Sequence, residues 1–167
     1  MEYEHIIHPF PPLYDRASRI LILGSLPSVK SREQMFFYGH PQNRFWRVLA
    51  SLWGEETPVT TEEKIAFLHR RHLALWDVIA SCEITGSADS AIRNAIPTDI
   101  TQILSGADIR CVCTNGGTAA ALYRRYQASA APALPHIALP STSPANAAWN
   151  LNRLCEAWRD VKVYAEQ

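Results

Sequence analysis

The stretch Arg19-Ile20-Leu21-Ile22-Leu23-Gly24-Ser25 indicates the class of fold. An unbroken apolar run that ends at a glycine is typical of a parallel strand buried on both faces. Short apolar runs recur at 73–78, 109–114 and 136–140, and helical patterns separate them. Strands that alternate with helices predict a parallel sheet covered on both faces. We therefore expect an α/β fold, a three-layer α/β/α sandwich around a central four-stranded parallel sheet.

The spacing of apolar residues predicts helices at 43–53, 60–72, 99–104, 118–126 and 147–159. Three segments are expected to lack regular structure: the Pro-rich residues 1–18, a long loop at 25–42 and a polar loop at 80–90. No linker divides the chain, and its 167 residues suit a single domain. We expect one domain over 1–167, with 1–18 as an irregular lead-in.

Composition narrows the function classes. The formal net charge is zero, so any affinity for DNA must come from a local patch. Cys111 and Cys113 flank one residue of an apolar run, which places both on one face of a strand. Without a C-x-x-C pair we expect no metal, and free thiols fit a reducing cytoplasm. No signal segment or bilayer-length apolar run occurs, so we expect no membrane partner.

The site is expected where the carboxyl ends of the strands open into loops, as in other open parallel sheets. Gly24-Ser25-Leu26-Pro27-Ser28 follows the first strand, and its glycine lets the backbone approach a ligand. The Gly-Lys pair of a phosphate-binding loop is missing, so this segment alone also fits a simple turn. Asp77 ends the second strand, where it could contact a ligand or serve as a capping or salt-bridged carboxylate.

The loop Phe36-Phe37-Tyr38-Gly39-His40-Pro41-Gln42-Asn43-Arg44-Phe45-Trp46 is rich in aromatic residues. Aromatic side chains on a loop can stack on nucleic-acid bases, and the alternative is a satellite core cluster. Asn43 stands at the start of a helix, where its structural alternative is an N-cap. His40 could be a general base or a hydrogen-bonding spacer.

The segment Leu139-Pro140-Ser141-Thr142-Ser143-Pro144-Ala145-Asn146 places three hydroxyls between prolines. Such a loop can grip a phosphate, or it can cap the last helix. No G-x-S-x-G elbow or H-E-x-x-H spacing occurs, which disfavours a hydrolase triad and a zinc protease.

Taken together, these segments resemble the motifs of hypoxanthine-DNA glycosylases, a branch of the uracil-DNA glycosylase superfamily. The resemblance runs from about Ile20 to Trp158 and also covers 75–78, 86–92 and 115–116. It implies a uracil-DNA glycosylase-like fold, no cofactor and no metal. The partner it implies is DNA containing a deaminated base (hypoxanthine, uracil or xanthine), which the enzyme removes in base excision repair.

The resemblance also implies roles for residues. In most of the superfamily the first motif carries an Asp or Asn that activates water, but this position resembles Leu26. In the hypoxanthine branch the asparagine of the His-Pro-x-Asn motif takes over, which makes Asn43 the expected catalytic residue. Tyr38 is expected to stack on the flipped base, and the expected base contacts come from Gly24, Ser25, Leu26 and Asp77. The expected DNA contacts come from Ser28, Lys30, His40, Ser141, Thr142, Ser143 and Asn146, the last as a candidate wedge.

Lys30 only borders the motif core, so a lyase reaction through an amine is not expected. We expect a monofunctional, monomeric, cytoplasmic glycosylase. Three alternatives stay open: a non-catalytic nucleic-acid-binding module of this fold, favoured by the loss of an acidic residue at Leu26; a uracil- or mismatch-specific glycosylase; and another small-molecule α/β enzyme.

Overall fold

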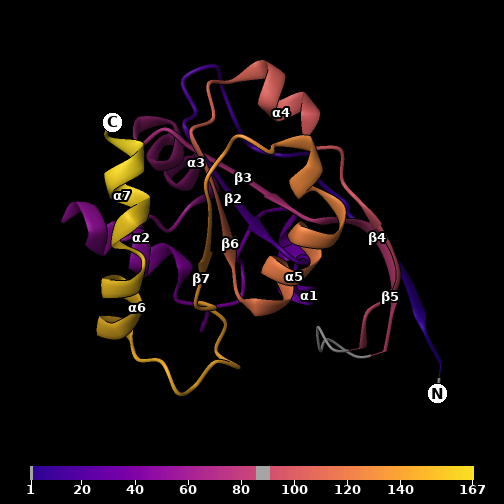
Figure 1. Ribbon diagram of the computed structural model, residues 1–167. Helices are drawn as coiled ribbons and strands as arrows, with labels where there is room; N and C mark the ends of the chain where they lie inside the picture. The colour runs from indigo at the N-terminus through magenta and orange to yellow at the C-terminus, as the bar shows by residue number, and fades with distance from the viewer. Residues whose placement is uncertain (1, 86–90) are drawn as a thin grey trace.

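A four-stranded parallel sheet forms the centre of the protein, whose computed structural model describes residues 2–85 and 91–167 (Figure 1). Its strands lie in the order β3-β2-β6-β7, and each neighbouring pair is parallel. They are β2 (Ile20–Gly24), β3 (Leu73–Asp77), β6 (Cys111–Asn115) and β7 (His136–Leu139). This arrangement confirms the sheet predicted from the apolar runs. Both β2 and β3 are buried throughout, which explains why their sequences lack polar alternation.

Helices cover both faces of this sheet. On one side, α2 (Phe45–Trp53) packs against α6 (Leu151–Ala157) and α7 (Arg159–Ala165), and α7 contacts β2. On the other side, α5 (Gly117–Tyr126) packs on β6 and β7 (Figure 1). Two further helices are α3 (Thr61–Arg70), which packs on β3, and α4 (Thr101–Gly106). Within the described residues, no helix has the length and apolar character that a bilayer crossing requires.

A second, antiparallel sheet contradicts two predictions. Its strands are β1 (Glu4–Ile7), β4 (Ile79–Ile84) and β5 (Arg93–Pro97), in the order β1-β4-β5. The segments 1–18 and 80–90 were therefore wrongly expected to be irregular throughout. Only one face of this sheet is buried, around a small cluster of Ile6, Ile79, Cys82 and Ile84. Antiparallel strands with one solvated face carry polar residues on that face. β4 therefore has no continuous apolar run, and for that reason it was not predicted as a strand.

One helix was not predicted, and the last predicted helix begins later and is interrupted. The loop predicted over 25–42 contains α1 (Val29–Gln34), whose N-cap Ser28 accepts a hydrogen bond from the Ser31 backbone N–H. The last predicted helix starts later than expected, at Leu151. It ends at Ala157 and continues as α7 after a break at the buried Trp158. The Trp158 indole donates to the Pro140 carbonyl, and this hydrogen bond connects the break to the loop at 140–146, which we call the serine loop.

The N-terminal chain covers the β3 edge of the central sheet. Leu13 and Leu75 exchange backbone hydrogen bonds of 2.9 Å as an isolated antiparallel bridge. The His8 backbone N–H donates to the Ala80 carbonyl at 2.8 Å. Pairing an edge strand in this way satisfies its free backbone groups. It also brings His8 beside the end of β3.

Candidate active site

A cavity of about 160 Å³ opens where β2, β3 and β6 end, as the strand-end rule predicts. Its walls come from the first motif, the aromatic loop, the ends of β3 and β6, and the serine loop. Most of the residues predicted for the site line it: Gly24, Ser25, Leu26, Ser28, Tyr38, Asn43, Asp77, Ser141, Thr142 and Ser143. The sequence motifs therefore converge on one concave surface.

Three residues predicted to contact DNA lie outside this lining. Lys30 is exposed and pairs with Glu33 at 3.4 Å. The His40 ring accepts a hydrogen bond from the Gln42 backbone N–H at 3.1 Å. The Asn146 side chain donates to the Ser141 carbonyl at 3.0 Å, so in this structure it braces the serine loop. Their contacts with DNA remain predictions.

Asn43 lines the cavity and also braces a helix. Its Oδ1 accepts hydrogen bonds from the Phe45 backbone N–H at 2.9 Å and from Thr142 Oγ1 at 2.8 Å. Because a backbone N–H can only donate, the oxygen of the amide must face α2. The two donors use both lone pairs of Oδ1, which leaves the Nδ2 amine of Asn43 as the group that can address a ligand.

Thr142 joins three motifs through hydrogen bonds. Its Oγ1 donates to Asn43 and accepts from Asn115 Nδ2 at 3.0 Å, and its backbone N–H donates to Asn115 Oδ1 at 3.0 Å. The side chain is fully buried, so the predicted direct contact with DNA does not fit its position. Thr142 acts as a positioning residue for Asn43. The sequence analysis included Asn115 in a segment that carries the resemblance but assigned it no role, and so missed this link.

The flanking serines stabilise their own loop. Ser141 Oγ accepts from the Ser143 backbone N–H at 3.1 Å, and Ser143 Oγ accepts from the Ala145 N–H at 3.2 Å. The Arg44 guanidinium donates to the Ser143 and Asn146 carbonyls at 2.8 and 3.1 Å. Sequence reasoning assigned Arg44 no role, although it holds this loop in place. Since each serine oxygen accepts a bond, each hydroxyl proton can still donate to a phosphate.

Tyr38 is held between the aromatic cluster and the cavity. Its backbone has φ of 51°, a left-handed conformation uncommon for a residue with a side chain. One face of its ring stacks on Phe45, with centroids 3.8 Å apart. Its hydroxyl is buried and makes no hydrogen bond within the described residues. Burial raises the pKa of Tyr38 above its usual range, and the negative charge of Asp77 raises it further. The nearby Asn115 side chain lowers this pKa by a smaller amount. The hydroxyl is therefore protonated at neutral pH and can donate.

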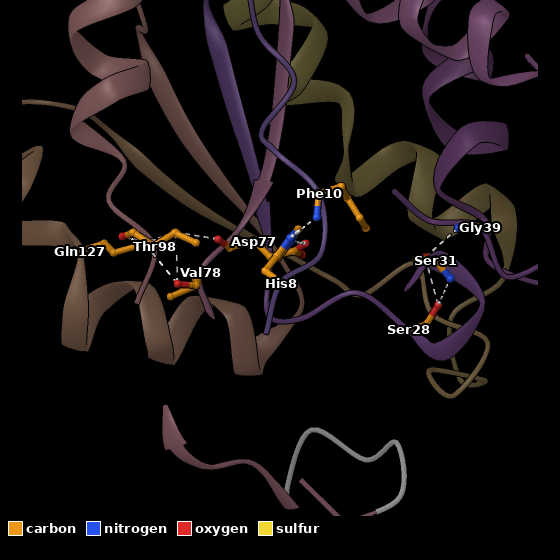
Figure 2. A network of polar contacts seen from close by, with 9 residues as sticks. All are labelled: His8, Phe10, Ser28, Ser31, Gly39, Asp77, Val78, Thr98 and Gln127. Atoms are coloured by element: carbon orange, nitrogen blue, oxygen red, sulfur yellow. Dashed lines mark hydrogen bonds and ion pairs between the residues drawn. The ribbon is translucent and has the colours of Figure 1, made fainter. Parts of the chain in front are cut away.

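Asp77 forms a buried pair with a residue that sequence reasoning missed. His8 Nε2 lies 2.7 Å from Asp77 Oδ2, and the two side chains are only 5% and 4% exposed (Figure 2). On the other side, Thr98 Oγ1 donates to the Asp77 carbonyl at 2.8 Å. His8 lies in the Pro-rich lead-in, and its partner is 69 residues away, so no local pattern signals the pair.

The aromatic loop is fastened to α1 by serine hydroxyls. Ser31 Oγ accepts from the Gly39 backbone N–H at 2.9 Å and from Ser28 Oγ at 3.0 Å (Figure 2). These bonds fix the turn directly after Tyr38. Arg32 also lines the cavity, and its Nε is buried without a hydrogen-bond partner among the described residues. Among those residues, no three His, Cys, Asp or Glu side chains gather in a way that could hold a metal ion.

Comparison with known proteins gives a consistent picture. Hypoxanthine DNA glycosylase of Methanosarcina acetivorans is 34% identical over 159 residues, which cover 91% of this chain and 95% of that protein. Hypoxanthine DNA glycosylase of Methanosarcina barkeri is 40% identical over 86 residues, about half of each chain (51% and 54%). A solution NMR structure from M. acetivorans, provisionally named as a uracil DNA glycosylase, superposes with a TM-score of 0.81 at 33% identity. It covers 95% of this chain and 97% of that one.

The family model for the uracil DNA glycosylase superfamily matches residues 11–162. This range contains every segment that carried the resemblance, although residues 86–90, part of the segment at 86–92, lie outside those that the structure describes. His8 and β1 precede the matched range, so one partner of the His8–Asp77 pair lies outside the family model. With this match and the 34% identity over most of both chains, the chain belongs to the uracil DNA glycosylase superfamily.

Proposed function

We propose that this protein is a monofunctional DNA glycosylase that hydrolyses the N-glycosidic bond of a deaminated base in DNA. Hypoxanthine is the preferred base in this proposal, with uracil and xanthine as further substrates, and the reaction is the first step of base excision repair. The observation that carries the proposal is the cavity itself, which is lined by both Asn43 and Asp77. The names of the two Methanosarcina relatives support the choice of base.

The substrate must enter the cavity as an unpaired nucleotide. A base stacked in a duplex is out of reach, so the enzyme rotates the nucleotide out of the helix. Deaminated bases pair less well than normal ones, which lowers the cost of this step. Phe45 covers one face of the Tyr38 ring, so Tyr38 would meet the extruded base along the ring edge that carries its hydroxyl, in place of the face-on stacking predicted from the sequence. Ser141 and Ser143 would hold the neighbouring phosphates through their hydroxyl protons, and Ser28 would do so by exchanging its bond to Ser31 Oγ for one to a phosphate.

Asp77 would recognise the base through its hydrogen-bonding edge. Hypoxanthine carries an N1–H donor and uracil an N3–H donor, whereas N1 of adenine is an acceptor. A carboxylate oxygen only accepts hydrogen bonds, so it can pair with either N–H but not with adenine N1. A buried acceptor left unpaired costs about 1–3 kcal/mol, which disfavours normal adenine.

Asn43 would position the attacking water. The water oxygen attacks C1′ of the sugar, the bond from C1′ to the base nitrogen breaks, and its electron pair leaves with the base. With Oδ1 engaged, Asn43 would hold the water through Nδ2 and leave a water lone pair free to attack. An amide cannot remove the proton efficiently, so the adduct at C1′ loses its proton to solvent and the departing base anion takes one up. The sugar, however, develops oxocarbenium-like positive charge as the bond breaks, so a weak nucleophile suffices. The rate then depends on positioning and on stabilising the departing base.

The same cavity argues against a lyase step. That reaction needs an amine nucleophile, and no lysine is among the residues that line the cavity in the described part of the chain. The DNA strand would therefore stay intact after base loss. We further propose that the enzyme acts as a monomer in the cytoplasm.

A panel of duplexes tests this function. Each duplex carries one hypoxanthine, uracil, xanthine or adenine at the same position, and release of the free base is measured with enzyme in excess. We expect fastest release of hypoxanthine and none of adenine. Preferred release of uracil would favour a uracil-specific glycosylase. Tight binding to all duplexes without release of any base would favour a non-catalytic module.

A further inference from the structure

His8 occupies a position that the proposed mechanism leaves unexplained. It enters from the N-terminal chain, next to β1, and its ring packs edge-on against Phe10 with centroids 4.6 Å apart. Its backbone is held by the bond to Ala80, and its Nε2 points at Asp77 (Figure 2). The histidine is therefore fixed from several sides, and the fold buries it against a residue of the cavity wall.

The hydrogen bonds of His8 define which atom donates. Its Nδ1 accepts from the Phe10 backbone N–H at 3.5 Å, so this nitrogen carries no proton. The proton is then on Nε2, which donates to Asp77 Oδ2 at 2.7 Å. Because Oδ2 is occupied by this bond, only Oδ1 of Asp77 can contact a ligand in the cavity. The bond also prevents rotation of the carboxyl group.

The other oxygen of Asp77 lies next to the Tyr38 hydroxyl. A methyl group placed on Gly24 would lie 2.4 Å from Asp77 Oδ1 and 3.1 Å from the Tyr38 hydroxyl oxygen. Both atoms thus converge on one point above Gly24, at the floor of the cavity. The Tyr38 hydroxyl is buried there without a partner among the described residues.

We propose that His8 is a positioning residue for base recognition, and that it aligns Asp77 Oδ1 with the Tyr38 hydroxyl as an acceptor–donor pair for the N–H and C=O groups of a deaminated base. This inference deepens the proposed function and rests on it. In hypoxanthine the N1–H and the O6 carbonyl are adjacent, and in uracil the N3–H and O4 are. Asp77 Oδ1 accepts from the N–H, and the Tyr38 hydroxyl donates to the carbonyl.

Adenine presents the opposite polarity at the same edge, with an acceptor at N1 and an amino donor at C6. Its N1 lone pair would face Asp77 Oδ1, and neither atom could donate. Without His8 the carboxyl could rotate and present either oxygen at a variable angle, which would weaken the discrimination. His8 therefore acts on the choice of base through Asp77, without touching the base itself.

The test measures binding, which does not require turnover. One duplex carries 2′-fluoro-2′-deoxyinosine, whose fluorine slows glycosidic cleavage. A matched duplex carries the same nucleotide with unsubstituted purine, which lacks both the N1–H and O6. The quantity of interest is the ratio of the two dissociation constants. We expect wild type to favour hypoxanthine, and Tyr38→Phe to reduce the ratio about 2- to 10-fold, as expected for the loss of one hydrogen bond.

His8→Phe should reduce the ratio by a similar factor, whereas His8→Gln, which retains an N–H donor, should keep most of it. His5→Phe, on the exposed side of β1, and Tyr126→Phe are matched controls that should leave it unchanged. Thermal melting identifies variants that fail to fold, and if His8→Phe fails, His8→Ala, which also lacks a donor, takes its place.

Folded Tyr38→Phe and His8→Phe variants with the wild-type ratio would overturn the inference, and so would a wild-type protein that binds both duplexes equally. Release of hypoxanthine from ordinary deoxyinosine is scored separately, because its absence would count against the proposed function while the binding ratio still tests His8.

Discussion

Replacing Gly24 with alanine should slow base release by about 100-fold, because the added methyl group would displace Asp77 from the cavity floor. The new Cβ would lie 2.4 Å from Asp77 Oδ1, whereas ordinary contacts begin near 3.4 Å. The carboxyl must therefore retreat by about 1 Å, and a misplacement of this size can cost on the order of 10² in rate even when the changed residue does not touch the reacting atoms. The Gly24 backbone is not in the left-handed region, so the backbone itself tolerates alanine.

The displaced carboxyl group of Asp77 cannot move without disturbing its hydrogen bond to His8 or the packing around it. Asp77 Oδ2 is bonded to His8 at 2.7 Å, and both side chains are buried. Insertion of a methyl group into such a packed region typically costs about 1–3 kcal/mol of stability. We therefore expect Gly24→Ala to lower the free energy of unfolding within that range while the protein stays folded at 25 °C.

Single-turnover release of hypoxanthine and urea denaturation measure the two effects. Gly117→Ala is the matched control, because a Cβ at Gly117 meets nothing within 4 Å and alanine favours the helix α5. A Gly24→Ala enzyme that releases hypoxanthine at the wild-type rate would refute the reasoning, since it would show that the position of Asp77 does not matter for the reaction.

Three further substitutions probe the same cavity. Asn43→Ala should reduce the single-turnover rate by about 10²-fold or more and leave the affinity for DNA, measured by anisotropy, nearly unchanged. Thr142→Val should lower the free energy of unfolding by about 1–3 kcal/mol, because Nδ2 of the half-buried Asn115 loses its acceptor and Asn43 Oδ1 loses a donor, and it should also slow base release. Asp77→Asn adds a donor to the base-reading edge, so the rate ratio of hypoxanthine to adenine should fall.

Each of these outcomes has a clear opposite. Wild-type rates in Asn43→Ala would leave this residue as a helix cap only. Thr142→Ser keeps the hydroxyl, so it should restore most of the stability that Thr142→Val loses, and equal effects of the two would point to the methyl group instead. An unchanged base preference in Asp77→Asn would make Asp77 a structural carboxylate.

The central sheet could be predicted from the sequence because its strands are buried on both faces. Runs such as 20–24 and 73–77 have no polar interruption, and the strand-end rule then places the ligand cavity correctly. Cys111 and Cys113 were expected on one face of their strand, and their sulfur atoms are indeed 4.0 Å apart.

What the sequence could not supply was pairing between distant segments. β4 is held by strands on both sides, and polar residues such as Ser81 and Glu83 made it resemble a loop. The His8–Asp77 pair depends on how the N-terminal chain crosses the edge of the sheet, which no local pattern specifies. Thr142 was predicted to contact DNA, and only its hydrogen bonds with Asn43 and Asn115 show its internal role.

The most direct test of a hydrolytic glycosylase site is the mass of the DNA after one turnover. A duplex with a single deoxyinosine is incubated with an excess of the wild-type protein, and both strands and the released small molecules are analysed by mass spectrometry. The account predicts free hypoxanthine and a full-length strand in which a hydroxyl at C1′ replaces the base, with the backbone uncut. An unaltered deoxyinosine strand would contradict the glycosylase activity, and a strand cleaved at the abasic site would contradict the monofunctional mechanism.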